Sequence, residues 1–233
     1  MEHLYDEPQK CLFCGEKFLS KKMKTRSVRL SGKDSDFCGH FSSDNPYFYD
    51  VLSCPSCGFA YTASFKSLTN RGRGLLEKAL PKKNSLSNFS GQRDLEAAIL
   101  CYKAALYMAS ILEESNLCIA NLCMRLAWMH RYKGDALEEK RFMSYALERY
   151  SDIYEKENLS DLPIQRPTLL YLLGELSFRV KGYTRCTEWF NLLFMENQGE
   201  QSFMEKARER WQEIRAERKR TEVPGAVSAM SAT

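Results

Sequence analysis

Two short cysteine motifs carry the clearest chemistry in this 233-residue sequence. Cys11 and Cys14 lie in one Cys-x-x-Cys-Gly motif, and Cys54 and Cys57 lie in a second. A tight turn with cysteines at positions i and i+3 presents two thiolates, and two such turns supply the four ligands of a tetrahedral zinc site. The sequence therefore predicts that these four cysteines bind one Zn²⁺ ion.

The expected zinc site is structural. Four thiolates leave no coordination position for water, so the ion would fold the domain and would not catalyse. The alternatives are cysteines that share no site and a redox-active cysteine pair. A redox protein is expected to carry a single Cys-x-x-Cys motif in a thioredoxin-like strand–helix context. The 39 residues between Cys14 and Cys54 are about twice the ~15–20 of compact sites. The longer loop costs only about 0.5 kcal/mol of closure free energy, so zinc remains the favoured interpretation.

A second group of candidate residues lies between the two motifs, at Asp34, Asp36, Cys38 and His40. These side chains could be extra ligands, a second metal site or a small catalytic cluster. A turn stabilised by its own side chains, with one incidental thiol, is favoured because four better-placed cysteines are present. Cys38 would be the first substitute if one motif failed to close.

Composition and cysteine use favour a cytoplasmic protein. Nine cysteines, an odd number, suit reduced thiols and metal better than a disulfide framework. No apolar run approaches the ~18–20 residues of a membrane span. The acidic first eight residues lack the apolar segment of a signal peptide.

Uneven charge suggests an anionic partner for the N-terminal part. Residues 1–93 carry 15 Lys and Arg against 9 Asp and Glu, whereas residues 94–204 carry 12 against 16. Nucleic-acid binding is therefore an alternative function, with basic side chains for phosphate and aromatic rings for stacking. The residues concerned are Lys21, Lys22, Lys24, Arg26, Arg71, Arg73, Tyr47, Phe48 and Tyr49. A solvated strand face and core packing are the favoured explanation of these residues.

Hydrophobic periodicity predicts strands before helices. Residues 23–30 and 47–52 have strand character, and residues 64–80 include a short helix. From Asp94 the period becomes helical, with breaks at Gly134, at 162–167 and at Gly182, which gives about five amphipathic helices. A last, highly charged helix follows over residues 201–221.

The expected fold class is α+β, mostly α. A small zinc-ribbon-like part occupies residues 1–65 and a connecting segment occupies 66–93. An antiparallel, tetratricopeptide-like helical array occupies 94–221, and a disordered tail occupies 222–233. The set Ala98/Tyr102/Ala105 follows the small–large–small spacing of such repeats, Cys186/Phe190/Leu193 follows it with a larger last member, and Glu139/Met143/Ala146 follows it in part. The spacings from Ala98 to Glu139 and from Glu139 to Cys186, 41 and 47 residues, exceed the usual ~34.

The order of motifs resembles the DUF2225 family of bacterial proteins. The resemblance rests on Tyr5-Asp6 before the first cysteine motif, Asp34-Ser-Asp-Phe-Cys38, Tyr49-Asp50-Val51, the second cysteine motif, and Leu126-Ala-Trp128-x-x-Arg131-x-x-Gly134-Asp135. It covers roughly residues 5–195. It implies a zinc-ribbon-like part, tetratricopeptide-like helices and a bacterial cytoplasmic setting, and it implies no catalytic residues.

The sequence thus favours a non-enzymatic zinc-binding adaptor that contacts a protein partner through its helices. Gly-rich phosphate loops, nucleophile elbows and paired catalytic carboxylates are missing from the sequence. Nucleic-acid association through the basic ribbon is the first alternative. A metalloenzyme using residues 34–40 is the second. No membrane association is expected.

Overall fold

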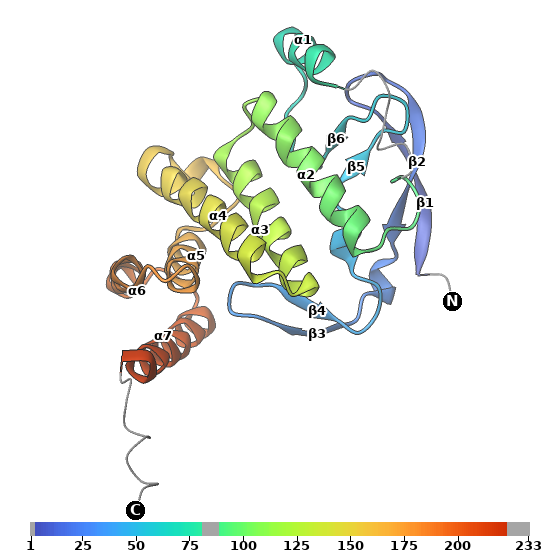
Figure 1. Cartoon of the computed structure of the whole chain (residues 1–233). Coiled ribbons are helices and arrows are strands. Elements are labelled where there is room, and N and C mark those ends of the chain that lie inside the picture. Colours follow the sequence, from blue (N-terminus) through green and yellow to red (C-terminus); the bar gives the residue numbers. More distant parts are fainter. Residues whose placement is uncertain (1–2, 81–88, 223–233) are drawn as a thin grey trace, which may run out of the picture. The chain divides into compact units, whose positions relative to one another are not determined.

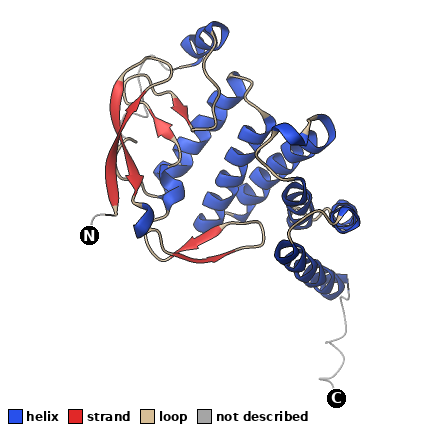
Figure 2. Cartoon of the chain, turned by 180° about the vertical axis from the view of Figure 1, so that it is seen from behind, coloured by secondary structure: helices blue, strands red, loops and turns tan. Residues whose placement is uncertain are grey.

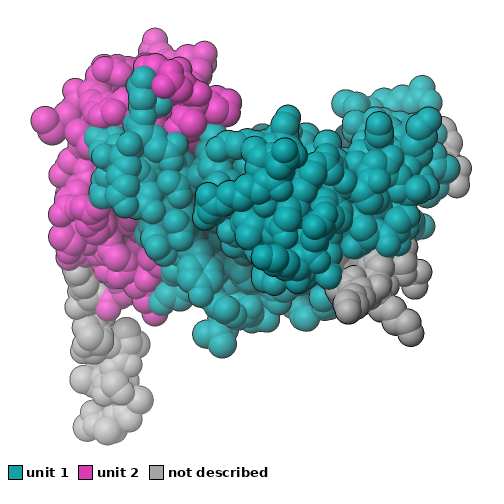
Figure 3. All heavy atoms as spheres, turned by 90° about the horizontal axis from the view of Figure 1, so that it is seen from above, with its two compact units in different colours: residues 1–158 teal, residues 159–233 magenta. Residues whose placement is uncertain are grey.

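Helices dominate the protein, and short strands precede them along the chain. The computed structural model describes residues 3–80 and 89–222 (Figure 1). Helices, with the 3₁₀ turns included, account for 59% of the described residues, and the strands form small antiparallel pairs near the N-terminus. The expected class, α+β and mostly α, is confirmed. The chain divides into two compact units, residues 1–158 and 159–233 (Figure 3).

Two-stranded antiparallel hairpins build the N-terminal part of the first unit (Figure 2). The pairs are β1 (Leu4–Lys10) with β2 (Lys17–Met23), β3 (Leu30–Lys33) with β4 (Gly39–Phe41), and β5 (Leu52–Ser53) with β6 (Ala60–Tyr61). The strand expected over residues 23–30 is wrong in its middle, because the 3₁₀ turn η1 (Thr25–Ser27) separates β2 from β3. Each sheet is too small to fold alone, so the hairpins depend on other contacts.

The strand expected over residues 47–52 is also largely wrong. The 3₁₀ helix η2 (Pro46–Tyr49) occupies most of it. The Asn45 side chain accepts a hydrogen bond from the Tyr47 amide at 3.0 Å, and proline opens the first turn. This capping outweighs the β propensity of the aromatic residues.

A buried arginine supplies hydrogen bonds that η2 lacks. Arg93 is 4% exposed and lies just before α2 (Leu95–Ile111). Its Nη1 donates to the carbonyl oxygens of Phe48 at 3.0 Å and Val51 at 2.7 Å. Because terminal helix carbonyls have no partner within the helix, Arg93 both satisfies these carbonyls and connects η2 to the helices.

Helices α1 to α4 complete the first unit, and α2, α3 and α4 pack side by side (Figure 1). Beyond α2 they are α1 (Asn70–Ala79), α3 (Asn116–Lys133) and α4 (Ala136–Lys156). The predicted break at Gly134 is confirmed, since this residue ends α3 with a φ of 78°, where glycine avoids the strain of a side chain. The short loop makes α3 and α4 antiparallel neighbours. The core side chains include Phe59, Leu76, Tyr102, Leu126, Met129 and Ile153.

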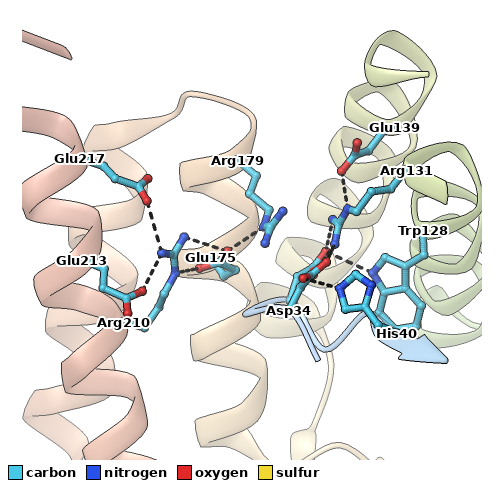
Figure 4. Close-up of polar contacts among 11 residues, drawn as sticks. Asp34, His40, Trp128, Arg131, Glu139, Glu175, Arg179, Arg210, Glu213 and Glu217 are labelled. Atoms are coloured by element: carbon cyan, nitrogen blue, oxygen red, sulfur yellow. Dashed lines mark hydrogen bonds and ion pairs between the residues drawn. The ribbon is translucent and has the colours of Figure 1, made fainter. Parts of the chain in front are cut away.

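The described residues of the second unit contain the 3₁₀ turn η3 (Leu159–Asp161) and the helices α5 (Arg166–Arg179), α6 (Tyr183–Glu196) and α7 (Gln201–Glu222). Glu175 on α5 is fully buried, and both of its carboxylate oxygens accept hydrogen bonds (Figure 4). Arg210 of α7 donates to Glu175 at 2.8 and 3.2 Å, and Arg179 donates at 2.7 Å. This bidentate ion pair joins α7 to α5.

None of the helices in the described residues combines the length and the apolar character needed to cross a membrane. The predicted division of the chain at residues 65, 93 and 221 stays a prediction. Residues 81–88 of the predicted connecting segment and residues 223–233 of the predicted tail lie outside the described residues.

Gly174 on α5 provides a test of the second unit. A Cβ atom here would lie 2.7 Å from Cε2 of Phe190 on α6, far inside van der Waals contact. We expect Gly174→Ala to lower the free energy of unfolding by about 1–3 kcal/mol through overpacking, despite the better helix propensity of alanine.

The matched control is Gly74→Ala on α1, where nothing lies within 4 Å of an added Cβ. This change should leave stability unchanged or raise it by up to about 1 kcal/mol. Chemical denaturation of both variants measures the difference. Equal effects at the two glycines would show that α5 and α6 do not pack as described.

Candidate metal centre

The two cysteine motifs form the tips of two hairpins with the same backbone geometry. In the β1–β2 hairpin the Cys11 amide donates to Glu16 O at 2.9 Å, and the Gly15 amide donates to Cys11 O at 3.1 Å. In the β5–β6 hairpin the Cys54 amide donates to Phe59 O at 3.0 Å, and the Gly58 amide donates to Cys54 O at 2.9 Å. Both glycines have positive φ, 77° and 75°, which explains glycine after each second cysteine.

The hairpin tips bring the four predicted ligands together. The Sγ atoms of Cys11 and Cys57 are 3.7 Å apart, those of Cys14 and Cys54 are 3.6 Å apart, and all four lie within 4.8 Å of one another. A tetrahedral zinc–thiolate site with bonds of ~2.3 Å has its sulfur atoms about 3.8 Å apart. A disulfide would require ~2.05 Å, and none of the four cysteines forms one. The donor set therefore fits a tetrahedral metal ion.

Aromatic packing and one arginine surround the cysteines. The rings of Phe59 and Tyr61 stack with centroids 5.0 Å apart, and both residues are buried. Arg73 of α1 donates to the backbone oxygens of Phe13 at 2.6 Å and Leu12 at 3.1 Å, within the first motif. Four thiolates around a divalent ion would carry a net charge of −2. The Arg73 guanidinium would therefore both order the turn and offset this negative charge.

The electrostatics of the cluster favour a thiolate before any metal binds. The hydrogen bond from Cys57 lowers the pKa of the Cys11 thiol to about 5. The same contact raises the pKa of Cys57, and burial raises the pKa of Cys54. One thiol of the pair thus loses its proton readily and the other keeps it. Because thiolates are the form that binds metal, the site is prepared for a cation.

The candidates at residues 34–40 lie in a different place and meet an arginine. Among the described residues, the four cysteines are the only group of His, Cys, Asp and Glu able to hold a metal ion. Asp34 and Asp36, at the tip of the β3–β4 hairpin, instead both accept hydrogen bonds from Arg131 of α3 (Figure 4). Their carboxylates are thus committed to a protein cation.

Asp36 is the centre of this ion cluster. It is fully buried, and its Oδ2 accepts from Arg131 Nη2 at 2.6 Å and from Trp128 Nε1 at 3.1 Å. Glu139 of α4 accepts from Arg131 Nε at 2.7 Å. Burial works to lower the pKa of the Arg131 guanidinium, but Asp36 and Glu139 raise it above its ordinary value. The cluster ties the β3–β4 hairpin to α3 and α4.

Cys38 and His40 likewise have local partners. The Cys38 thiol is fully buried and lies 3.3 Å from the Tyr132 hydroxyl, and burial raises the pKa of Cys38 to about 11. His40 Nε2 lies 2.7 Å from Asp34 Oδ1. Neither belongs to the four-cysteine cluster. The interpretation of this loop as a turn stabilised by side chains agrees with these contacts.

Two lysines of the basic run pair with acidic residues within the first hairpin. Lys21 Nζ lies 3.0 Å from Asp6, and Lys22 Nζ lies 2.9 Å from Glu7, on the adjacent strand. Of the aromatic residues proposed for base stacking, Tyr49 is buried and Tyr47 packs under the Arg125 guanidinium. These side chains have less charge and surface to offer a nucleic acid than the sequence indicated.

Replacing Arg131 tests the ion cluster. Arg131→Leu leaves the buried Asp36 carboxylate without its cation, so we expect a loss of about 3–5 kcal/mol in the free energy of unfolding. The control Lys22→Ala removes a surface pair and should cost no more than about 1 kcal/mol. Urea denaturation measures both. Similar midpoints for the two variants would contradict the structural role of Arg131.

Asp34 gives this cluster a pH dependence. Burial works to raise the pKa of Asp34, but hydrogen bonds from His40 and Arg131 outweigh it and hold that pKa below its ordinary value. A carboxyl whose pKa is lower in the folded state stabilises the protein above its unfolded-state pKa, near about 4, and loses that contribution as pH falls.

We therefore expect Asp34→Asn to be less stable than wild type at neutral pH. The difference should shrink as pH falls from about 4 through the lowered folded-state pKa. Denaturation midpoints of both proteins across this range test the expectation. A difference that stays constant or grows on acidification would assign the effect of the substitution to another cause.

Comparison with known proteins assigns the family. No curated protein and no solved structure matches the chain. The family described as "Uncharacterized protein conserved in bacteria (DUF2225)" matches residues 4–214, which span the hairpins, the four cysteines and all of the helices up to most of α7. The chain therefore belongs to the DUF2225 family.

Proposed function

We propose that this protein is a non-enzymatic zinc-binding adaptor, in which a structural Zn²⁺ holds two hairpins together and the helices contact a protein partner. The observation that carries the metal assignment is the spacing of the Cys11–Cys57 and Cys14–Cys54 sulfur pairs, 3.7 and 3.6 Å. Soft thiolate ligands in a tetrahedron are typical of zinc. Bound there, the ion would supply folding free energy through four cysteine ligands.

The structural role follows from the ligand count. All four coordination positions of a tetrahedral ion are filled by the four cysteines of the two hairpins, so no position is left for a reacting water. The Asp34 and Asp36 carboxylates, which a metalloenzyme would need, are committed to Arg131. This commitment weighs against the metalloenzyme alternative.

The partner surface that we favour lies over α2 and α4. Leu100 and Tyr107 on α2 are 51% and 55% exposed, seven residues apart and so on one side of the helix. Between them Lys103 reaches toward α4, with its Nζ 4.0 Å from Glu138 and 5.9 Å from the centroid of the Phe142 ring. Large exposed apolar side chains on neighbouring helices mark protein–protein contact surfaces.

Nucleic-acid association has less support because Lys21 and Lys22 pair with acidic residues on β1. It retains a direct test in the full-length protein. Binding of labelled single-stranded DNA or RNA at low salt, with affinity falling steeply as salt rises, would favour it over the adaptor. Fluorescence anisotropy measures this.

Zinc content tests the metal assignment. We expect one zinc per purified chain by elemental analysis, and loss of that zinc in Cys57→Ser. Cys38→Ser is the matched control, because the Cys38 thiol is buried against Tyr132 and lies outside the cysteine cluster. It should retain one zinc. Full zinc in Cys57→Ser, or loss of zinc in Cys38→Ser alone, would overturn the ligand set.

The adaptor role is tested by crosslinking and affinity capture from bacterial cells. A double variant, Leu100→Ala with Tyr107→Ala, should lose the partner that wild type captures. Leu30→Ala is the control, since Leu30 is 49% exposed on β3 and belongs to neither α2 nor α4. A partner retained equally by all three proteins would place the contact elsewhere, and no partner for folded, zinc-loaded wild type would count against the adaptor.

A further inference from the structure

A recess in the first unit brings together two opposite charges that neither the metal site nor the ion cluster uses. Its volume is about 250 Å³. Its walls come from η2, from the segment after β6, and from α2 and α3. The lining residues that matter here are Asp50, Thr62, Ser64, Tyr102, Asn121 and Arg125.

Arg125 forms the cationic wall of this recess. Its guanidinium carbon lies 3.7 Å from the centroid of the Tyr47 ring and 4.8 Å from that of Trp128. Stacking occupies the face of a guanidinium and leaves its N–H edge able to donate in the plane. Burial works to lower the pKa of Arg125, but Tyr102 and Asp50 raise it. The residue therefore presents a fixed positive charge with available donors.

Asp50 forms the anionic wall. Its Oδ2 accepts a hydrogen bond from the Tyr102 hydroxyl at 3.2 Å and lies 3.4 Å from Arg125 Nη2. Within the part of the chain that the structure describes, Oδ1 accepts no hydrogen bond. Although 43% of the side chain is exposed, the recess raises the pKa of Asp50 by burial. This carboxylate has an uncommitted oxygen and incomplete solvation.

Neutral polar groups border the charged pair. The hydroxyls of Thr62 and Ser64 are 2.7 Å apart, and Ser64 Oγ lies 3.4 Å from the Cys118 thiol. Leu122 and Ala63 add apolar wall. A few polar groups converging on a partly apolar recess are typical of small-ligand sites.

We infer that this recess binds a small zwitterion, an α-amino acid, whose carboxylate pairs with Arg125 and whose ammonium pairs with Asp50. The charges select this class. A simple anion would be repelled by Asp50 and a simple cation by Arg125, whereas a zwitterion satisfies both. Pockets for drug-sized molecules begin near ~300 Å³, so about 250 Å³ suits a ligand of amino-acid size. This inference is independent of the adaptor proposal.

The test uses the full-length, metal-loaded protein and each of the common L-α-amino acids as probes. We expect at least one to raise the melting temperature and to give saturable heat in isothermal titration calorimetry. Two analogues of that amino acid, one without the amine and one without the carboxylate, should give neither signal. Binding by no amino acid, or equal binding by either analogue, would overturn the inference.

Variants locate the site. Asp50→Asn and Arg125→Lys should each weaken binding about tenfold or more, because the first removes the negative charge and the second removes the planar, stacked set of N–H donors. Ala63→Phe should abolish binding by filling the recess without changing a charge, and Ala136→Phe, at the exposed start of α4, should not. Circular dichroism and metal content establish that each variant is folded. Unchanged affinity in folded Ala63→Phe would exclude this recess.

Discussion

The N-terminal half of this protein depends on four sulfur atoms meeting at one point. Its hairpins are too short to fold independently, and the tips of two of them are separated by 39 residues of chain. The four sulfur atoms lie within 4.8 Å of one another. Without a metal, this close contact would contribute little to the stability of the folded state. A bound divalent ion turns this arrangement into a net stabilisation.

Three arginines that follow the hairpins in the chain also hold the hairpin region in place. Arg73 donates to the carbonyls of the first cysteine motif, Arg93 to those around η2, and Arg131 to the carboxylates of the β3–β4 hairpin. Each arginine donates hydrogen bonds to a segment that has little regular secondary structure and therefore few donors of its own. A planar guanidinium with five N–H groups can serve several acceptors at once. The hairpins are therefore fixed by polar contacts where an apolar core is too small.

The predictable features were those with a local signal. The four cysteines could be identified because their spacing is short and repeated, and the end of α3 because Gly134 allows a positive φ. The strand expected over residues 47–52 is wrong because Asn45 caps and Pro46 opens a 3₁₀ helix there, which outweighs the β propensity of the aromatic residues. The adaptor role and the identity of the metal go beyond what the local signals establish.

Other features had no local signal at all. Arg131 meets Asp36 across 95 residues of sequence, and Arg125 lies beside Asp50 from a separate helix. Each of these residues alone is an ordinary charge on an expected helix or loop. Only the fold makes them partners, because the helices return to the hairpins after a long excursion of the chain. Because an unpaired buried charge lowers the stability of the folded state, burial makes each of these ion pairs important for stability.

The chain connects the Asp50 recess directly to the four cysteines. Cys54 and Cys57 lie between Asp50 and the Thr62–Ser64 segment, so the hairpin that holds the second pair of thiolates also carries two walls of the recess. Any loosening of that hairpin would move Asp50 and the hydroxyls apart from Arg125, which is fixed on α3 by its stacking contacts. Metal binding and ligand binding would then favour the same folded state of the hairpin, which is thermodynamic coupling between two sites. A metal ion held by the four cysteines would in this way favour the formed recess.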